Sequence, residues 1–273
     1  MNVKLETKRI AICADDFGMN GAIDEGILSL AQRGRLTATS CLVTGPSFLG
    51  NVPALRQSGL QLGLHLNFTE ALGQPGLYLP INKLIAQTYL LRLGTGRVRE
   101  QIVAQLDAFE DALGQSPDFV DGHQHVHQFP QIRDELLFEL ARRYPSSKPW
   151  LRYTKARSAP SLPARMRFKA RVIQALGSRR FAQLAQRQGF PLNSRFLGVY
   201  DFQGGQEMYA VLLRAWLSHA ADGDLLMCHP AKRVDSLDAL GAQRQAEFEV
   251  LAGDQAGQWL DDYGLKPGRL PIG

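Results

Sequence analysis

The stretch "RIAICADDF", residues 9–17, sets the frame for the rest of the chain. An apolar, strand-like run ends there in two adjacent carboxylates, Asp15 and Asp16. Asn20 is then placed to cap a helix, and Gly34 is placed to end it. A short buried strand that passes directly into an amphipathic helix is the repeating unit of α/β proteins.

The same unit recurs along the chain. Six further apolar or β-branched segments are predicted strands: residues 35–43, 60–68, 118–127, 149–154, 194–202 and 224–231. Helical patterns separate them, and the clearest runs from residue 97 to 113. Repeated βα units over this length predict a mostly parallel sheet or barrel, with functional residues at the carboxyl ends of the strands.

The length of 273 residues suits one large domain or two small ones. No repeat, low-complexity tract or linker divides the chain, so we expect a single domain over residues 1–273. Two segments, at about 70–96 and 155–195, are expected to be insertions. Within the second, residues 163–188 predict a basic helix pair or one long helix.

Charge and cysteine content restrict the class of protein. The formal net charge is +5, and the basic residues are spread out except for a denser stretch between Arg152 and Arg187. This pattern favours a solvated basic face over a nucleic-acid site. The three cysteines lie far apart, and no apolar run approaches the length of about 18 residues that a membrane helix needs. We therefore expect a cytoplasmic protein without a signal peptide or membrane span.

The adjacent Asp15 and Asp16 allow two interpretations. Acidic residues favour turns and helix N-termini, so the pair could form a solvated turn or a helix cap. Neighbouring residues of a strand point to opposite faces, but a turn at its end can aim both into one site. The buried strand before them favours a site in which one carboxylate binds a cation and the other acts as a base.

The segment "VDGHQHVHQFP", residues 120–130, holds three of the chain's six histidines. If the strand continues through it, Asp121, His123, His125 and His127 share one face. Imidazoles two residues apart, at a spacing of about 6.6 Å, can converge on one metal. A purely structural cluster would have to accommodate three imidazoles that repel one another when protonated. We predict a metal-binding or catalytic role for at least one of them.

Two further histidines lie in predicted strands, towards their carboxyl ends. His65 lies in "GLHLNF", where the neighbouring leucines share the opposite face. A lone strand histidine is more often structural, but in a barrel its face would be the interior. His229 directly follows "LLMC" and precedes a proline. Acids and histidines thus end the first, third, fourth and last predicted strands, which indicates one pocket. A mixed Asp and His set suits a borderline or hard divalent cation with an open position for water.

Four motifs together resemble the YdjC/ChbG family of carbohydrate deacetylases, which includes hopanoid-associated relatives. They are "ADDFGMN" at 14–20, "GLHLNF" at 63–68, "DGHQHVHQFPQI" at 121–132 and "MCHPA" at 227–231. The resemblance extends from about residue 9 to beyond residue 229. It implies an α/β fold, a deformed (β/α) barrel related to the NodB polysaccharide deacetylases. It also implies removal of acetyl groups from N-acetylglucosamine-containing molecules with one divalent metal ion, Mg²⁺ or Zn²⁺.

The resemblance also implies roles for single residues. The metal ligands map to Asp16, His65 and His123, and the catalytic base maps to Asp15. The residues alone leave His123 and His125 as alternatives for the metal. The resemblance favours His123 and leaves His125 to contact substrate or to support the site.

The predicted reaction is metal-assisted hydrolysis of a linear amide C–N bond. Asp15 takes a proton from water, and His229 or His125 protonates the leaving amine. Arg152 is expected to orient Asp15 or a sugar hydroxyl. Tyr153 and His127 are the other expected substrate contacts. The expected partner is an acetylated amino sugar, with no nucleic acid, and the resemblance is compatible with a homodimer.

Three alternatives remain at this point. A phosphoesterase-like hydrolase on the same barrel would hold two metals about 3.5–4 Å apart. A non-catalytic sugar-binding relative would bind without turnover. A nucleic-acid-binding protein would show steep salt dependence. The acetylated substrate is also open, from a chitooligosaccharide to a lipid-linked sugar or other glycolipid. We expect substrate choice to reside in residues 70–96 and 155–195.

Overall fold

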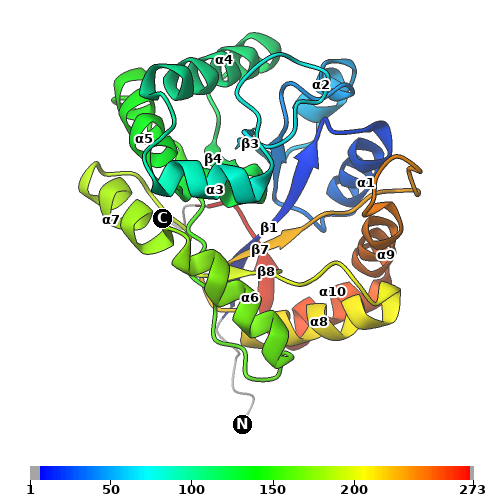
Figure 1. The fold of residues 1–273 in the computed structure, drawn as a ribbon. Helices are drawn as coiled ribbons and strands as arrows, with labels where there is room; N and C mark the ends of the chain where they lie inside the picture. The colour runs from blue at the N-terminus through cyan, green and yellow to red at the C-terminus, as the bar shows by residue number, and fades with distance from the viewer. Residues whose placement is uncertain (1–6, 271–273) are drawn as a thin grey trace.

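The centre of the molecule is one curled sheet of parallel strands surrounded by helices (Figure 1). The computed structural model describes residues 7–270. Its strands are β1 (Lys8–Phe17), β2 (Ala38–Cys41), β3 (Gln61–Leu66), β4 (Phe119–Gly122), β5 (Trp150–Leu151), β6 (Phe196–Leu197), β7 (Leu225–Cys228) and β8 (Leu265–Pro267). They follow the order β5-β4-β3-β2-β1-β7-β6, and β8 pairs with β1.

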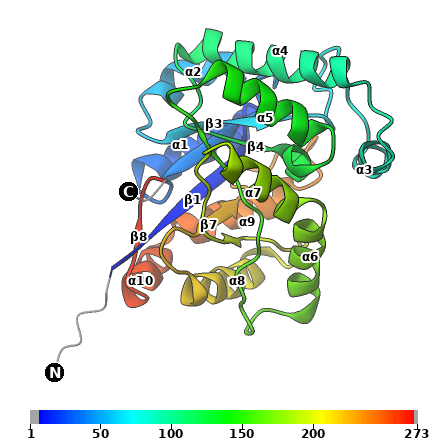
Figure 2. The ribbon, with the colours of Figure 1, turned by 90° about the vertical axis from the view of Figure 1, so that its left-hand side faces the viewer.

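Helices connect successive strands and cover the outer face of the sheet (Figures 1 and 2). They are α1 (Gly21–Gln32), α2 (Phe48–Arg56), α3 (Ile81–Tyr89), α4 (Thr95–Leu113), the 3₁₀ segment η1 (His123–Gln128), α5 (Ile132–Arg143), α6 (Ala164–Ala175), α7 (Ser178–Arg187), α8 (Gly205–His219), α9 (Gly241–Ala252) and α10 (Asp254–Asp262). On β3, Leu62, Leu64 and Leu66 belong to the large core beneath these helices.

The opposite face of the sheet encloses a second, smaller apolar cluster. Successive strand residues alternate between the faces, so Ile10 and Ile12 join the outer core while Ala11 and Cys13 join the inner one. Strands on both sides of β1 contribute to the inner cluster, and its Phe119 and Trp150 rings stack at 4.2 Å. This cluster fills the interior of the curled sheet, as side chains fill the interior of a small barrel.

The barrel is deformed where its two edge strands approach each other. Between β5 and β6 the pairing is reduced to isolated parallel bridges, Leu151 with Leu192 and Ala156 with Phe196. The fold class expected from the sequence, a deformed (β/α) barrel, is therefore confirmed. All seven predicted strands are present, and the predicted basic helix pair corresponds to α6 and α7.

One expectation about local structure was wrong, and two features were not foreseen in detail. The predicted strand 118–127 ends at Gly122, because the chain turns into η1 there. The segment 70–96 contains α3 and the start of α4 in addition to irregular chain. The sequence also gave no indication of α10 and β8, which follow the last predicted helix.

Within residues 7–270, no helix combines the length and apolar character that crossing a bilayer requires.

Candidate active site

The first strand carries its two carboxylates on an irregularity in the sheet. Ala14 pairs with Thr39, whereas Phe17 pairs with Cys41, so β1 holds one residue more than β2 between these partners. Asp16 takes up the extra length with a φ of 71°. Such a bulge re-aims side chains, and both Asp15 and Asp16 line one cavity of about 980 Å³.

Arg152 holds Asp15 in a fixed orientation. Its guanidinium donates from Nη1 to Oδ2 and from Nη2 to Oδ1, each at 2.6 Å. Both residues are buried, and Arg152 also forms an ion pair with Asp121. Burial alone would raise the pKa of Asp15, but the Arg152 guanidinium holds it below the usual range. Asp15 is therefore a carboxylate at any ordinary pH.

His65 and Asp121 form a cross-strand pair that orients the imidazole. The two residues are register partners on β3 and β4, and His65 Nδ1 lies 2.7 Å from Asp121 Oδ1. This contact leaves His65 Nε2 facing Asp16 Oδ1 at 3.3 Å. Burial would lower the pKa of His65, but the carboxylates of Asp121 and Asp15 raise it to about 10. The surroundings of this imidazole thus strongly favour a positive charge.

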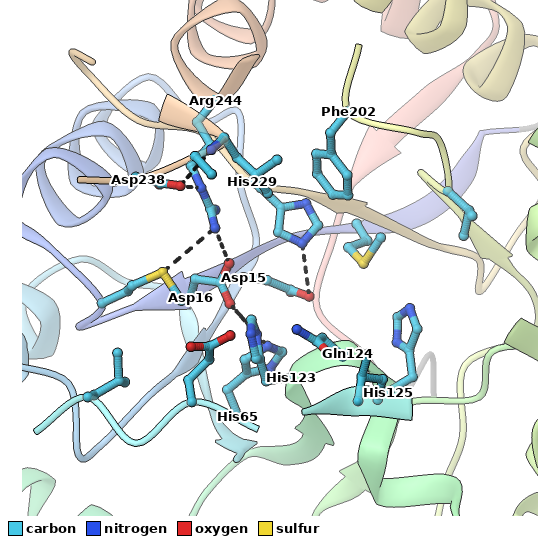
Figure 3. A pocket seen from close by; sticks show the side chains of 18 of the residues that line it. Asp15, Asp16, His65, His123, Gln124, His125, Phe202, His229, Asp238 and Arg244 are labelled. Atoms are coloured by element: carbon cyan, nitrogen blue, oxygen red, sulfur yellow. Dashed lines mark hydrogen bonds and ion pairs between the residues drawn. The ribbon is translucent and has the colours of Figure 1, made fainter. Parts of the chain in front are cut away.

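Asp16, His65 and His123 form a group that could hold a metal ion. Their ligand atoms lie within 4.8 Å of one another, and His123 Nδ1 is 2.9 Å from Asp16 Oδ1 (Figure 3). One carboxylate and two imidazoles suit a divalent cation with an open position. The contact of Asp121 with the far nitrogen of His65 is the arrangement that commonly orients a metal-binding histidine. The donor set therefore fits the predicted metal.

Arg244, on α9, binds the other oxygen of Asp16. Its Nη2 donates to Asp16 Oδ2 at 2.7 Å, and its Nε lies 2.8 Å from Asp238 Oδ2 (Figure 3). Burial would raise the pKa of Asp16, but Arg244 and His123 hold it well below its usual value. Arg244 thereby fixes Asp16 with Oδ1 turned towards the two imidazoles.

The histidine segment is a tight turn rather than a strand. Gln124 and His125 both have positive φ, 52° and 61°, and the chain folds into η1. The expectation that Asp121, His123, His125 and His127 share one strand face was therefore wrong. A left-handed backbone at two successive residues destroys the alternation on which that expectation rested.

The turn separates the three histidines. His123 faces Asp16, whereas His125 lines the same cavity with its ring against Phe196 at 5.4 Å. Of the three, His123 alone belongs to a group of potential metal ligands found in residues 7–270. His127 is fully buried, and its Nε2 lies 3.0 Å from the Arg152 carbonyl oxygen.

His229 completes the polar floor, by which we mean Asp15, Asp16, His65, His123 and His229. Its Nε2 lies 3.9 Å from Asp15 Oδ2 (Figure 3). Burial lowers the pKa of His229 to about 4. At neutral pH its ring is therefore neutral and ready to accept a proton.

Glu247 fixes the backbone of His229. It lies one helical turn after Arg244 on α9, accepts from the His229 backbone N–H at 2.6 Å and accepts from the Tyr200 hydroxyl at 2.6 Å. The carboxyl group is fully buried, and burial raises its pKa to about 7. One face of α9 thus supports two members of the polar floor.

The residues expected to contact substrate divide into two groups. The cavity is lined by all five floor residues and by His125. Within residues 7–270, the side chains that line the cavity do not include Arg152, Tyr153 or His127. Arg152 lies beneath Asp15, and the Tyr153 backbone N–H donates to Asn193. The structure therefore places these three residues behind the site.

Sequence reasoning missed Arg244 and Glu247. Both stand at buried positions of α9, on the same face as Phe248 and Leu251. A charged residue on the apolar stripe of an amphipathic helix must find a buried partner, which is a signal that the sequence contained. The pairing of His65 with Asp121 was missed because strand register cannot be read from one strand alone.

Comparison with known proteins places the chain in a family. The sequence profile described as "YdjC-like protein" matches residues 9–262, and the chain belongs to this family. A chitooligosaccharide deacetylase of Salmonella schwarzengrund (strain CVM19633) is 27% identical, over 95% of this chain and 96% of that protein. A carbohydrate deacetylase of Mus musculus is 35% identical, over 45% of this chain and 44% of its own length. The chain therefore matches less than half the length of the mouse protein.

Solved structures agree on the fold. A protein of Enterococcus faecalis V583, provisionally named for cellobiose-phosphate cleavage, has a TM-score of 0.71 at 23% identity, covering 96% of this chain and 97% of that one. The Bc1960 peptidoglycan N-acetylglucosamine deacetylase has a TM-score of 0.54 at 12% identity, covering 98% and 88%. At sequence identities this low, the similarity to both structures is evidence for the fold alone.

Proposed function

We propose that this protein is a metal-dependent deacetylase that hydrolyses the N-acetyl group of an N-acetylglucosamine-containing carbohydrate. The observation that carries the proposal is the polar floor. An ionised Asp15, clamped by Arg152, stands beside the potential metal ligands Asp16, His65 and His123 in one cavity. The names of the bacterial and mammalian relatives support the same activity.

The proposed metal ligands are Asp16, His65 and His123, and their donor atoms support this choice. A divalent cation bound there would polarise the acetyl carbonyl and lower the pKa of a water molecule. Arg244 keeps Asp16 oriented, and Asp121 keeps the Nε2 of His65 turned inward. Mg²⁺ and Zn²⁺ both remain consistent with this set, and Zn²⁺ is favoured by its two imidazoles.

Asp15 is the proposed general base. The double hydrogen bond from Arg152 leaves it ionised, and its place next to the metal ligands puts it within reach of the attacking water. The same clamp makes Asp15 a weak base, so the proton is readily passed on. His229 Nε2, 3.9 Å from Asp15 Oδ2, is the proposed acceptor of that proton.

His229 is the proposed proton donor to the leaving amine. A ring whose pKa is about 4 is neutral before the reaction and cannot act first as an acid. We infer that the proton travels from water to Asp15, then to His229, and finally to the amine nitrogen as the C–N bond breaks. His125 lies further along the cavity, and its role as an alternative donor stays a prediction.

The test uses purified protein loaded with Zn²⁺ or Mg²⁺ and di-N-acetylchitobiose, with released acetate as the readout. Acetate release that requires the metal and disappears in Asp15→Asn is the expected result. Metal binding without acetate release from this substrate or from longer and lipid-linked N-acetylglucosamine compounds would contradict the proposal and favour a non-catalytic sugar-binding protein.

The structure speaks against the two-metal alternative. A second group of potential ligands, Cys13, Asp15 and Asp121, lies beside the first. The Arg152 guanidinium already binds both of these carboxylates, so its positive charge takes the place that a second cation would need.

The cytoplasmic location and the homodimer stay predictions.

A further inference from the structure

We propose that the outer face of α6 binds the surface of an anionic lipid bilayer. The exposed residues that make up this face, called the basic α6 face below, are Arg165, Arg167, Phe168, Arg171 and Val172. Within residues 7–270, the side chains that line the cavity include none of these five. The inference therefore concerns a second surface of the molecule, and it does not depend on the proposed function.

The charge around this face has one sign over a long stretch of chain. Residues 140–200 contain 14 Lys and Arg residues and no Asp or Glu. The other residues of the chain hold 17 Lys and Arg against 26 Asp and Glu. The positive net charge of the protein thus comes from this one region, and such an asymmetry indicates an anionic partner.

The exposed side of α6 also carries apolar side chains. Phe168 and Val172, one helical turn apart, are 69% and 41% exposed. Successive residues of an α-helix are about 100° apart, so Arg165 lies on one flank of this pair and Arg171 on the other. The buried Met166 lies on the opposite side of the helix. An apolar stripe that faces solvent between arginines is typical of a helix at a membrane interface.

The arginines of this face are available for phosphate groups. Arg167 and Arg171 are exposed, and within residues 7–270 neither forms an ion pair with a carboxylate. Arg165 is exposed as well and pairs with Asp201 at 3.1 Å. A guanidinium donates two parallel hydrogen bonds to a phosphate group, as it does to a carboxylate. Lipid headgroup phosphates would therefore give these side chains the partners that the protein does not supply.

Exposed apolar surface is concentrated on this side of the molecule. Figure 2 shows α3 and α6 on the same side of the barrel. Within residues 7–270, ten large apolar residues are exposed, and five of them belong to α6 or to the end of α3 and the two residues after it. Those at α3 are Tyr89, Leu90 and Leu91. Single exposed apolar residues are ordinary, but a group on one side of a protein marks an interaction surface.

A bilayer matches both parts of the face, whereas other partners match one. Headgroup phosphates suit the arginines, and the boundary of the acyl chains suits Phe168 and Val172. A nucleic acid offers phosphates but no apolar layer in which an aliphatic side chain such as Val172 would leave water. A second copy of this chain would bring arginine against arginine across a twofold axis, with no acid in residues 140–200 of either copy.

The experiment measures binding of the purified full chain to lipid vesicles by co-sedimentation. Vesicles of phosphatidylcholine alone are compared with vesicles of phosphatidylcholine and phosphatidylglycerol, each at low and at high salt. We expect binding to the anionic vesicles that weakens as the salt concentration rises, and little binding to the neutral ones. Absence of binding to the anionic vesicles at low salt would overturn the proposal.

Two pairs of arginine substitutions locate the contact. Arg167→Gln combined with Arg171→Gln should weaken vesicle binding roughly 25-fold, since each basic residue near the surface is worth roughly fivefold. Arg33→Gln combined with Arg214→Gln is the matched control. It removes two exposed arginines of α1 and α8 and changes the net charge equally. An equal loss in both pairs would mean that net charge alone attracts the protein, and the basic α6 face would be rejected.

Phe168→Ser tests the apolar part of the face. We expect it to weaken binding to anionic vesicles by at least about fivefold. Phe138→Ser, at a phenylalanine of α5 that is 51% exposed, should change nothing. Urea unfolding checks that each variant is folded. Unchanged binding in Phe168→Ser, or tighter binding of a single-stranded oligonucleotide than of the vesicles at the same salt concentration, would identify a site for soluble polyanions and refute the bilayer.

Discussion

The polar floor and the apolar wall belong to one cavity but are built in opposite ways. The floor consists of side chains at or just after strand ends, and its carboxylates have buried partners, as Asp15 has Arg152 and Asp16 has Arg244. The apolar wall consists of six aliphatic side chains that line the same cavity, most of them partly exposed: Leu72, Ile81, Ile85, Ile173, Leu176 and Leu237. We therefore expect the buried, paired floor to be the more rigid region and the partly exposed wall to be the more adaptable one.

The largest effect is expected at Asp15. Asp15→Asn removes the proposed base and leaves Asp16, His65 and His123 unchanged, so acetate release should fall by roughly 10³-fold while metal affinity is retained. Steady-state acetate assays and metal titration provide the two measurements. Glu25→Gln, at an exposed position on α1, is the matched control. Full activity in Asp15→Asn would show that Asp15 is not the general base.

The next effect separates two neighbouring histidines of the turn. His123→Gln removes a proposed ligand, and its metal affinity should fall by more than the roughly 10–100-fold typical of losing a supporting contact. His125→Gln should retain wild-type metal affinity, because that ring lies against Phe196. Competition with a chelator of known affinity gives both constants. The reverse result would assign the metal to His125.

Arg244 tests whether the floor depends on its buried partners. In Arg244→Gln the Oδ2 of Asp16 loses its charged donor, so the ligand can rotate away from the imidazoles. We expect metal affinity to fall roughly 10–100-fold. Arg233→Gln, which removes a surface arginine from the chain between β7 and α9, should have no effect. Unchanged metal affinity in Arg244→Gln would show that Arg244 supports the fold only.

The floor was largely predictable from the sequence, because its residues stand where short apolar strands end. Asp15, Asp16, His65 and His229 needed no more than the βα pattern and the rule that strand ends meet at one edge. His123 was selected over His125 by family resemblance, since a strand through the segment would have placed both on one face. The left-handed turn at Gln124 and His125 was not readable, because neither residue is of a type that requires it.

The wall and the supporting residues were less predictable for a physical reason. Side chains on α3 and α6 line one cavity only because of how the segments 70–96 and 155–195 fold, and no periodicity within either segment specifies that arrangement. The contacts of Arg244 and Glu247 join α9 to β1 and to the residue after β7, which are distant in sequence. Such long-range pairs follow from the fold and not from local pattern.

The pH dependence of the free energy of unfolding tests whether His127, which lies behind the floor, is buried as a neutral ring. Burial lowers its pKa from 6.5 to about 4, so the unfolded chain binds a proton between these values that the folded chain does not. Above pH 6.5 the ring is neutral in both states, and the protein has its full stability. As the pH falls from 6.5 towards 4, the free energy of unfolding decreases by about 3 kcal/mol in all. His127→Gln can keep the hydrogen bond to the Arg152 carbonyl and should reduce the loss. Urea unfolding of both proteins at several pH values measures the difference, and equal losses would show that His127 is not the group that titrates.

The smallest effect is expected on the wall, and it bears directly on the comparison. Leu237 is 96% exposed on the loop before α9, so Leu237→Ser removes little buried surface and should change the free energy of unfolding by less than about 0.5 kcal/mol. Leu226→Ser, at a fully buried position of β7, should cost several times more, because it leaves a cavity and a buried hydroxyl. Urea unfolding measures both. A cost for Leu237→Ser close to that of Leu226→Ser would mean that this part of the wall belongs to the packed core and is no more adaptable than the floor.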